Sequence, residues 1–291
     1  DLARAYYEKN GDKLLDVPEA ERQEALAQFG LSINLPKMKT DLERYKIHYD
    51  NWFYESSLHE SGYVKETVDL LAERGWTYEK DGALWLRTAD ILRDHYRRQG
   101  KKEADIEKLD LKDDVLRRAN GFYTYFAADI AYHRNKFAVR GFDKVINIWG
   151  ADHHGHVARL QAALDGLGLD GSHRLVVVLM QLVNLMQDGK PVRMSKRSGK
   201  AIALHDLLDE ISVDAARYFF NSRASTSPLD FDLDLAVRED SENPVYYVQY
   251  AHARICSVLK KLEAAGVTFE GADALDASLL TDPSEQALLR L

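Results

Sequence analysis

Two short apolar runs flank a stretch of helical periodicity in the middle of the chain. Residues 145–149 read Val-Ile-Asn-Ile-Trp and end at Gly150, and residues 175–179 form a second apolar run. Between them, 153–167 has the apolar spacing of a helix. Strand, helix and strand in this order predict a βαβ unit with two buried parallel strands. Ligands bind beyond the carboxyl ends of such strands, so 150–156 is the expected ligand site.

The other segments surround this unit. A hairpin is predicted around the turn dipeptide Asp81-Gly82, and the mixed charges of 93–118 favour a solvated surface insertion. Further stretches with the periodicity or capping of helices are 41–62, 64–75, 124–137, 204–210, 213–221 and a long one that opens at Asn243-Pro244. The long helix carries an apolar stripe, which predicts a partner in a helical bundle. The stripe consists of Val245, Val248, Ile255, Leu259 and Leu262.

Composition excludes several classes of protein. The 291 residues are 45% hydrophobic and 30% charged, as in a globular chain of about two domains. A net charge of −8 excludes a uniformly basic nucleic-acid coat but not a local basic patch. The single cysteine, Cys256, cannot form an internal disulfide or a Cys-based zinc cluster, which favours a reducing compartment. No apolar run approaches the ~20 residues of a membrane helix, and the start lacks both a signal peptide and an initiator Met, which suggests a fragment or a processed chain.

The first candidate site is 150–156, Gly-Ala-Asp-His-His-Gly-His. Gly150 allows close approach of a ligand to the backbone, and Asp152 can accept hydrogen bonds from ribose hydroxyls. The start of the following helix offers free N–H groups to an anion. An ordinary strand-to-helix turn capped by Asp152 is the alternative. A metal site built from the three histidines is not predicted, because no cysteine or acidic cluster accompanies them.

Residues 186–200 form a second candidate site with five basic side chains and one acidic side chain. In a chain of net charge −8 this is a focused positive potential, and the interleaved small and hydroxyl residues suit a loop that wraps phosphates. A solvated basic loop or the end of a hairpin explains the same charges equally well.

Helical spacing brings two further groups together. Tyr125 and Asp129 are four residues apart on one helix face, where a carboxylate beside an aromatic ring suits a guanidinium. Spacing alone favours an exposed surface pair. Tyr247, Tyr250 and Arg254 lie opposite the apolar stripe of the long helix and could stack on unpaired bases. Packing against a neighbouring helix explains that row at least as well.

These motifs, in this order, resemble the class I aminoacyl-tRNA synthetases. Segment 194–199 is similar to their KMSKS signature loop, with Arg193 in place of its first Lys and Arg197 in place of its final Ser position. Segment 123–133 resembles the arginine-site helix of the bacterial arginyl-tRNA synthetases. Other segments that resemble these enzymes are 149–156, 230–236 and 243–255, the last being similar to the first helix of their anticodon-binding domain. The order and spacing hold from about residue 41 to residue 254.

The resemblance implies an α/β fold. It would comprise the second half of a Rossmann-type catalytic domain with an α+β insertion, followed by the start of an all-α anticodon-binding bundle. The implied regions are the insertion (1–115), the second catalytic half with the signature loop (116–200), a helical linker (201–242) and a truncated bundle (243–291). No His-Ile-Gly-His signature precedes residue 41. The chain is therefore expected to be an internal piece of a longer enzyme, inactive alone. The alternatives are a stand-alone synthetase-like paralogue that binds nucleotide or RNA without catalysis, and a class I synthetase for another amino acid.

The implied activity is that of an arginine–tRNA ligase, which activates L-arginine with ATP and transfers it to tRNA(Arg). Mg²⁺ would arrive with ATP, no tightly bound protein metal is expected, and the intact enzyme would be a cytoplasmic monomer that does not bind membranes. The implied catalytic residues are Lys196, Arg193 and Arg197. The implied ATP-binding residues are Gly150, Asp152, His156, Met194 and Ser195. The implied arginine-binding residues are Tyr125, Asp129 and His153, and the implied tRNA-binding residues are Tyr247, Tyr250 and Arg254.

Overall fold

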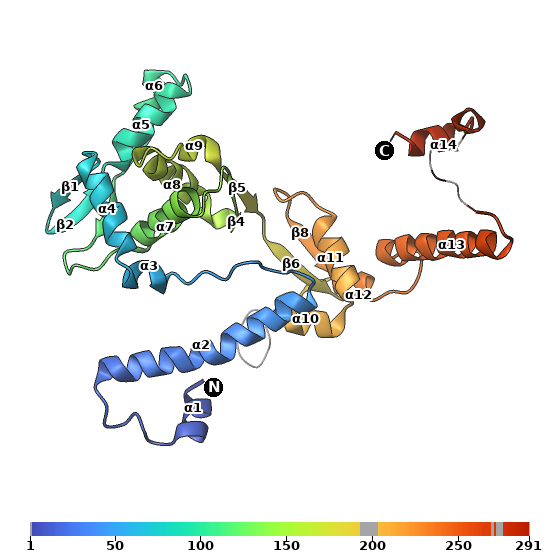
Figure 1. Cartoon of the computed structure of the whole chain (residues 1–291), viewed down its shortest axis with the longest axis horizontal. Helices are drawn as coiled ribbons and strands as arrows, with labels where there is room; N and C mark the ends of the chain where they lie inside the picture. The colour runs from blue at the N-terminus through green and yellow to red at the C-terminus, as the bar shows by residue number, and fades with distance from the viewer. Residues whose placement is uncertain (1, 193–202, 269–270, 272–275, 291) are drawn as a thin grey trace. The chain divides into compact units, whose positions relative to one another are not determined.

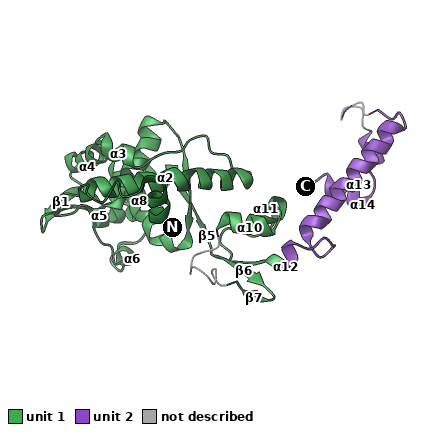
Figure 2. Ribbon diagram, turned by 90° about the horizontal axis from the view of Figure 1, so that it is seen from below, with its two compact units in different colours: residues 1–233 green, residues 234–291 purple. Residues whose placement is uncertain are grey.

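The computed structural model describes residues 2–192, 203–268, 271 and 276–290. The chain divides into two compact units, residues 1–233 and residues 234–291 (Figure 2). The first unit contains three small sheets and most of the helices, and the second is helical (Figure 1).

A parallel strand pair and the helix between its strands form the centre of the first unit. Strand β4 (Val145–Gly150) pairs in register with β5 (Leu175–Met180), and α8 (His154–Gly166) and α9 (Gly171–Arg174) connect them. The predicted βαβ unit is therefore confirmed. The expectation that its first strand is buried is wrong for one face, because Ile146 and Ile148 are 61% and 71% exposed. An apolar run indicates a strand, but it does not say what covers each face.

An antiparallel sheet of three strands lies before this unit in the sequence. Its strands are β1 (Thr77–Lys80), β2 (Ala83–Leu86) and β3 (Asp114–Arg117), in that order across the sheet. The predicted hairpin is confirmed, with positive φ at both Asp81 and Gly82. The solvated insertion expected at 93–118 is wrong at its C-terminal end, because β3 pairs with β2 and buries Leu116. The strand is amphipathic, so its charged side chains indicated a solvated segment although Leu116 is buried on the other face.

A third sheet has the strand order β7-β6-β8, which the sequence pattern did not predict. Its strands are β6 (Val183–Gln187), β7 (Lys190–Pro191) and β8 (Leu229–Asp232). The hairpin between β6 and β7 turns at Asp188-Gly189, where both residues have positive φ. This is the same dipeptide as in the first hairpin, so a signal was present. Helices α10 (Leu204–Glu210) and α11 (Val213–Asn221) confirm the two short helices predicted before β8.

The N-terminal helices correct one prediction. They are α1 (Leu2–Asn10), α2 (Glu19–Arg44), α3 (Ser56–Glu60) and α4 (Tyr63–Glu73), the last as predicted. A helix over 41–62 is wrong, because α2 ends at Arg44 and Lys46 takes a positive φ. Residues 51–54 are not helical, and Phe53 stacks on Tyr132 at 4.6 Å between ring centroids. Phe53 was counted as part of a helical period, but it packs on Tyr132 from a segment that is not helical.

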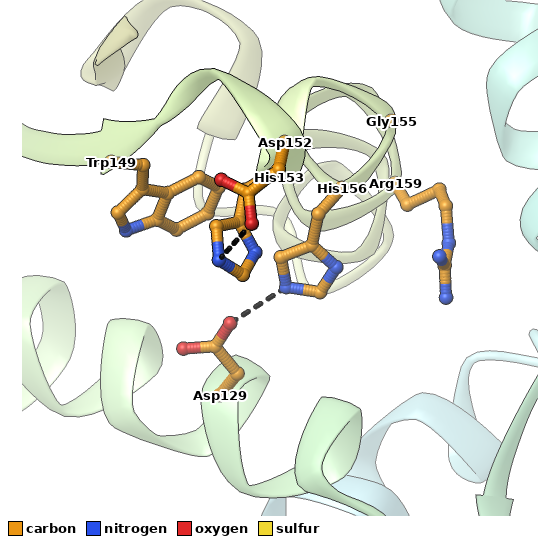
Figure 3. Close-up of a pocket in the computed structure, with 7 residues that line it drawn as sticks. All are labelled: Asp129, Trp149, Asp152, His153, Gly155, His156 and Arg159. Carbon is orange, nitrogen blue, oxygen red and sulfur yellow. Dashed lines mark hydrogen bonds and ion pairs between the residues drawn. The ribbon is translucent and has the colours of Figure 1, made fainter. Parts of the chain in front are cut away.

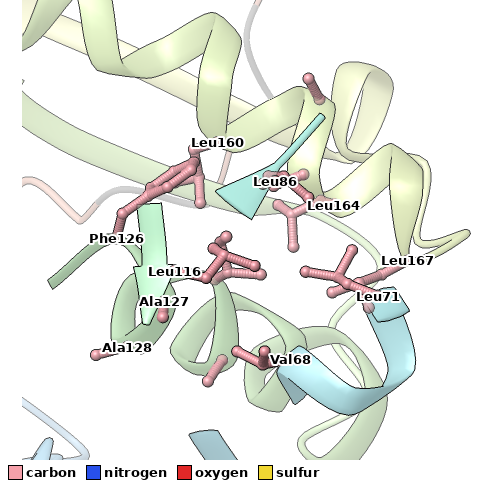
Figure 4. Packing of buried hydrophobic residues seen from close by; sticks show 14 of the residues in the cluster. Val68, Leu71, Leu86, Leu116, Phe126, Ala127, Ala128, Leu160, Leu164 and Leu167 are labelled. Atoms are coloured by element: carbon pink, nitrogen blue, oxygen red, sulfur yellow. The ribbon is translucent and has the colours of Figure 1, made fainter. Parts of the chain in front are cut away.

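The hydrophobic core lies between the antiparallel sheet and the βαβ unit (Figure 4). Helix α7 (Tyr125–Arg134) packs against α4 and α8, and α5 (Thr88–Arg98) packs against α8. Leu71, Leu164 and Leu86 are fully buried there. After α7 the chain continues as one π-helical turn, Asn135–Val139, and the short helix α6 (Glu103–Ile106) follows α5. This core fixes the helices that carry the candidate site.

The second unit is built around one long helix. Helix α13 (Pro244–Ala264) begins as predicted, with the Asn243 side chain accepting a hydrogen bond from Val245 N at 3.0 Å. The remaining elements are α12 (Leu233–Ala236), a 3-10 turn at Ala277–Leu279 and α14 (Pro283–Leu288). Val245 is buried, whereas Ile255 and Leu259 are 60% and 58% exposed. Among the described residues, no partner covers the rest of the apolar stripe.

Candidate active site

A cavity of about 580 Å³ opens at the carboxyl end of β4. Its walls come from α7, from β4, from the turn that leads into α8 and from α8 itself (Figure 3). The lining residues are Asp129, Trp149, Asp152, His153, Gly155, His156 and Arg159. The position agrees with the site expected at 150–156 from the strand–helix pattern.

The turn after β4 presents Asp152 and His153 to the cavity. A single 3-10 turn, Ala151–His153, joins the strand to α8. A Cβ atom at Gly150 would lie 2.5 Å from Asp152 Oδ1, so a larger residue at this position would displace the exposed side chain of Asp152. The side chains of Asp152 and His153 are 81% and 60% exposed, and His153 Nε2 is 3.6 Å from Asp152 Oδ2. Because both side chains are largely exposed, both can turn towards a ligand.

Asp129 enters the cavity from the middle of α7. The start of that helix is fixed by Thr124, whose hydroxyl donates to Val115 O at 2.7 Å and accepts from Ala127 N at 3.3 Å. Asp129 then projects towards α8, where its Oδ2 lies 2.8 Å from His156 Nε2 (Figure 3). A carboxylate only accepts hydrogen bonds, so His156 donates.

Aromatic rings hold His156 against Asp129. The imidazole lies 5.3 Å from the Phe126 ring in an edge-to-face arrangement and 5.4 Å from the Trp149 ring. The side chains of His156 and Asp129 are 23% and 30% exposed, so the pair borders the cavity while its geometry is set by packing.

A hydrogen-bonded network lies behind Asp129. His133 Nδ1 donates to the backbone carbonyl of Asp129 at 2.8 Å, and Asn147 Nδ2 donates to His133 Nε2 at 2.7 Å. Lys136 Nζ donates to Asn147 Oδ1 at 3.4 Å. Burial is the main cause that lowers the pKa of His133, and the charge of Lys136 lowers it further. Burial also lowers the pKa of Lys136 to about 8, against the opposing attraction of Asp129.

Arg159 closes another side of the cavity. Its guanidinium forms an ion pair with Asp114 on β3 and lies 5.0 Å from the centre of the Phe126 ring. Asp114 also accepts a hydrogen bond from the Thr88 hydroxyl at 2.8 Å. These contacts join the antiparallel sheet to α8, so the cavity depends on elements more than 40 residues apart in sequence.

The structure separates some of the predicted site residues. Tyr125 is 84% exposed at the first position of α7 and does not line the cavity, whereas its neighbour Phe126 contacts His156. Trp149 and Arg159 were missed. Trp149 directly precedes Gly150 at the end of the strand and Arg159 lies one helical turn after His156, so their spacing was an available signal.

Two groups of predicted residues lie elsewhere. The signature-loop residues Arg193, Met194, Ser195, Lys196 and Arg197 lie outside the described residues. Tyr247 and Tyr250 are 61% and 51% exposed on α13, and Arg254 Nη1 lies 3.3 Å from the Tyr250 hydroxyl. Within the described ranges, no group of His, Cys, Asp or Glu side chains could hold a metal ion. No helix in those ranges is long and apolar enough to span a membrane.

The fold is mixed α/β, with a cavity at the carboxyl end of a parallel strand. A family model described as tRNA synthetases class I (R), catalytic domain, matches residues 33–227. The chain belongs to this family.

Curated relatives extend the match along the whole chain. This chain is 52% identical over 290 residues to the arginine–tRNA ligase of Caldanaerobacter subterraneus subsp. tengcongensis. The match covers 100% of this chain and 48% of the relative. It is 53% identical over 281 residues to that of Ruminiclostridium cellulolyticum, with 97% and 47% covered. The chain thus spans about half the length of these relatives.

Solved structures agree with this assignment. A putative arginyl-tRNA synthetase from Campylobacter jejuni matches with a TM-score of 0.74 and 38% identity, over 90% of this chain and 53% of that one. The arginyl-tRNA synthetase of Thermus thermophilus matches with a TM-score of 0.68 over 98% of this chain and 55% of that one. At 20% identity, the second match supports the fold alone.

Proposed function

We propose that this chain carries the amino-acid-binding and ATP-binding part of an arginine–tRNA ligase. The observation that carries the proposal is the half-buried carboxylate of Asp129 in a cavity at the end of a parallel strand. A carboxylate in this position can bind the planar guanidinium of arginine through two parallel hydrogen bonds, whereas the ammonium of lysine cannot make that pair. The relatives named arginine–tRNA ligase support the same substrate.

The proposed reaction has two steps. A carboxylate oxygen of arginine attacks the α-phosphorus of ATP, which forms arginyl-adenylate and releases pyrophosphate. A hydroxyl of the terminal adenosine of tRNA(Arg) then attacks the arginyl carbonyl and AMP leaves. Asp129 holds the guanidinium, His153 lines the same cavity, and Tyr125 contributes only if its exposed ring turns towards the amino acid.

ATP would bind on the other side of the cavity. Gly150 allows its close approach, Asp152 accepts hydrogen bonds from its ribose, and the N–H groups at the start of α8 face its phosphates. The 2.8 Å contact of His156 with Asp129 supports a role for His156 beside the amino acid, in addition to the ATP role implied by the resemblance.

The signature loop would act on the phosphates. Lys196, with Arg193 and Arg197, would stabilise the charge that develops on the leaving pyrophosphate, which is electrostatic catalysis. Met194 and Ser195 would place that loop beside the nucleotide. Mg²⁺ would arrive with ATP as part of the substrate.

The remaining regions would serve the tRNA. Tyr247, Tyr250 and Arg254 present two exposed rings and a guanidinium, which can stack on unpaired bases. We propose that β4, α8 and β5 belong to the second half of a Rossmann-type domain with an α+β insertion before it. Helix α13 would begin the anticodon-binding bundle, and the enzyme would be a cytoplasmic monomer.

The test uses the complete product of the reading frame that encodes this chain, here called the reading-frame product. ATP–pyrophosphate exchange is measured with arginine, lysine or citrulline, and without amino acid as the control. Arginine is expected to support exchange, with citrulline at least ten-fold lower, because losing a charged hydrogen bond costs roughly 1.5–3 kcal/mol. Binding of ATP or RNA without exchange for any of these amino acids would contradict the proposal and favour a non-catalytic paralogue.

A further inference from the structure

The Asp129 carboxylate has an imidazole partner within the chain. His156 donates from Nε2 to Asp129 Oδ2 at 2.8 Å, and contacts with Phe126 and Trp149 keep the ring in place. Both members of the pair are partly exposed, so His156 can exchange its proton with solvent. The oxygen that His156 occupies is one of the two that a bidentate guanidinium would use.

The groups nearest this pair have other partners. His133 Nδ1 lies 3.5 Å from Asp129 Oδ1, but it donates to the backbone carbonyl of Asp129 at 2.8 Å, and its ring is 2% exposed. Lys136 contacts Asn147 Oδ1 and lies 4.1 Å from the centre of the Tyr132 ring.

The charged groups on the cavity wall are also engaged. Arg159 is paired with Asp114, and His153 faces Asp152. His156 is therefore the described imidazole that is both accessible to solvent and hydrogen-bonded to the carboxylate of Asp129.

We propose that His156 is the counter-ion of Asp129 that the arginine guanidinium replaces, so that amino-acid binding expels a proton from the imidazole. This inference rests on the proposed function. Two cations beside one half-buried carboxylate repel each other, and arginine cannot lose its charge. The imidazolium can lose its proton near neutral pH and is therefore the group that yields. A neutral ligand such as citrulline would leave that proton in place.

The test is a calorimetric titration of arginine into the reading-frame product. At each pH, two buffers with different ionisation enthalpies give the number of protons released. We expect up to one proton released per arginine at the acid end of the range, and less as the pH rises. As the pH is lowered through the acid range, the Kd for arginine is expected to rise by up to about ten-fold per pH unit, because binding must release the proton. The buffer comparison on the unmodified protein needs no variant.

Two variants locate the proton. His156→Gln keeps a hydrogen-bond donor without the charge, so proton release and the pH dependence of Kd should disappear. His173→Gln removes an exposed histidine that is paired with Asp170 at 2.6 Å outside the cavity, and should retain proton release.

The outcomes separate this inference from the proposed function. Arginine binding without proton release, or equal release from His156→Gln and the parent, would overturn the inference alone. No arginine binding at any pH would overturn the proposed function and the inference together.

Discussion

Helices α8 and α13 differ in what covers their apolar side chains. Leu160 and Leu164 of α8 are fully buried, whereas Ile255 and Leu259 of α13 are 60% and 58% exposed. The packed helix carries His156, whose position is fixed by rings from α7 and β4. An apolar stripe can thus predict a helix in both regions, but a side chain is held in a functional geometry only where that stripe is buried. The proposed arginine site has such a scaffold among the described residues, and the proposed tRNA residues do not.

The largest expected effect tests this difference directly. Leu164→Ala should lower the free energy of unfolding by about 2–5 kcal/mol, because it leaves a cavity in a closed core. The matched substitution Leu259→Ala should change it by less than about 0.5 kcal/mol, since that side chain is exposed. Denaturant unfolding followed by far-UV circular dichroism measures both. Similar losses for the two variants would remove the distinction between the regions.

The second prediction concerns Lys136, the half-buried lysine behind Asp129. The pKa of Lys136 is about 8 because of burial, against an ordinary value of 10.5. Between these pH values the unfolded chain binds more protons than the folded chain, so Lys136 makes stability rise with pH from about 8 to about 10.5. The gain is on the order of 2 kcal/mol, allowing for its partial exposure.

Lys136→Met should remove that rise. The difference in unfolding free energy between parent and variant, measured from about pH 7 to about pH 10, cancels the other titrating groups. Lys65→Met is the control, because Lys65 is exposed and its partner Asp69 raises its pKa. Parallel stability curves for the parent and Lys136→Met would contradict the buried environment assigned to Lys136.

The smallest expected effect concerns the capping residue of the exposed helix α13. Asn243→Ala should destabilise the first turn of α13 by about 1 kcal/mol, because the side chain accepts from Val245 N and donates to Arg238 O at 2.7 Å. Asn243→Asp keeps the acceptor but sets a carboxylate oxygen against the Arg238 carbonyl at a buried position, so it should lose at least as much. Amide hydrogen exchange at the start of α13 is the measurement. Unchanged protection in Asn243→Ala would mean that this capping interaction adds nothing to the helix.

Local signals in the sequence predicted the elements at the centre of the fold. The apolar runs and Gly150 located the β4–α8–β5 unit, and Asp81-Gly82 located the first hairpin. They failed where long-range packing decides. Nothing local indicates which face of β4 is covered, or that Phe53 stacks on a ring almost 80 residues later.

The site was predicted to a similar extent. The strand–helix pattern placed a ligand site at 150–156, and spacing along α7 grouped Asp129 with Tyr125 but favoured an exposed surface pair. The roles of Asp129 and His153 at the amino acid came from the resemblance. Spacing did not show that His156 turns towards Asp129, because that contact joins residues 27 positions apart on two helices. The same spacing also selected Tyr125, which lies on the exposed side of the helix start.

The central claim is that Asp129 binds the guanidinium of arginine. The most direct measurement is the affinity of the reading-frame product for arginine and citrulline, compared with that of its Asp129→Asn variant, by calorimetry at neutral pH. We predict that the substitution weakens arginine binding by about ten-fold to a hundred-fold, consistent with roughly 1.5–3 kcal/mol for a charged hydrogen bond, and reduces the preference over citrulline. Unchanged arginine affinity in a folded Asp129→Asn protein would contradict the account.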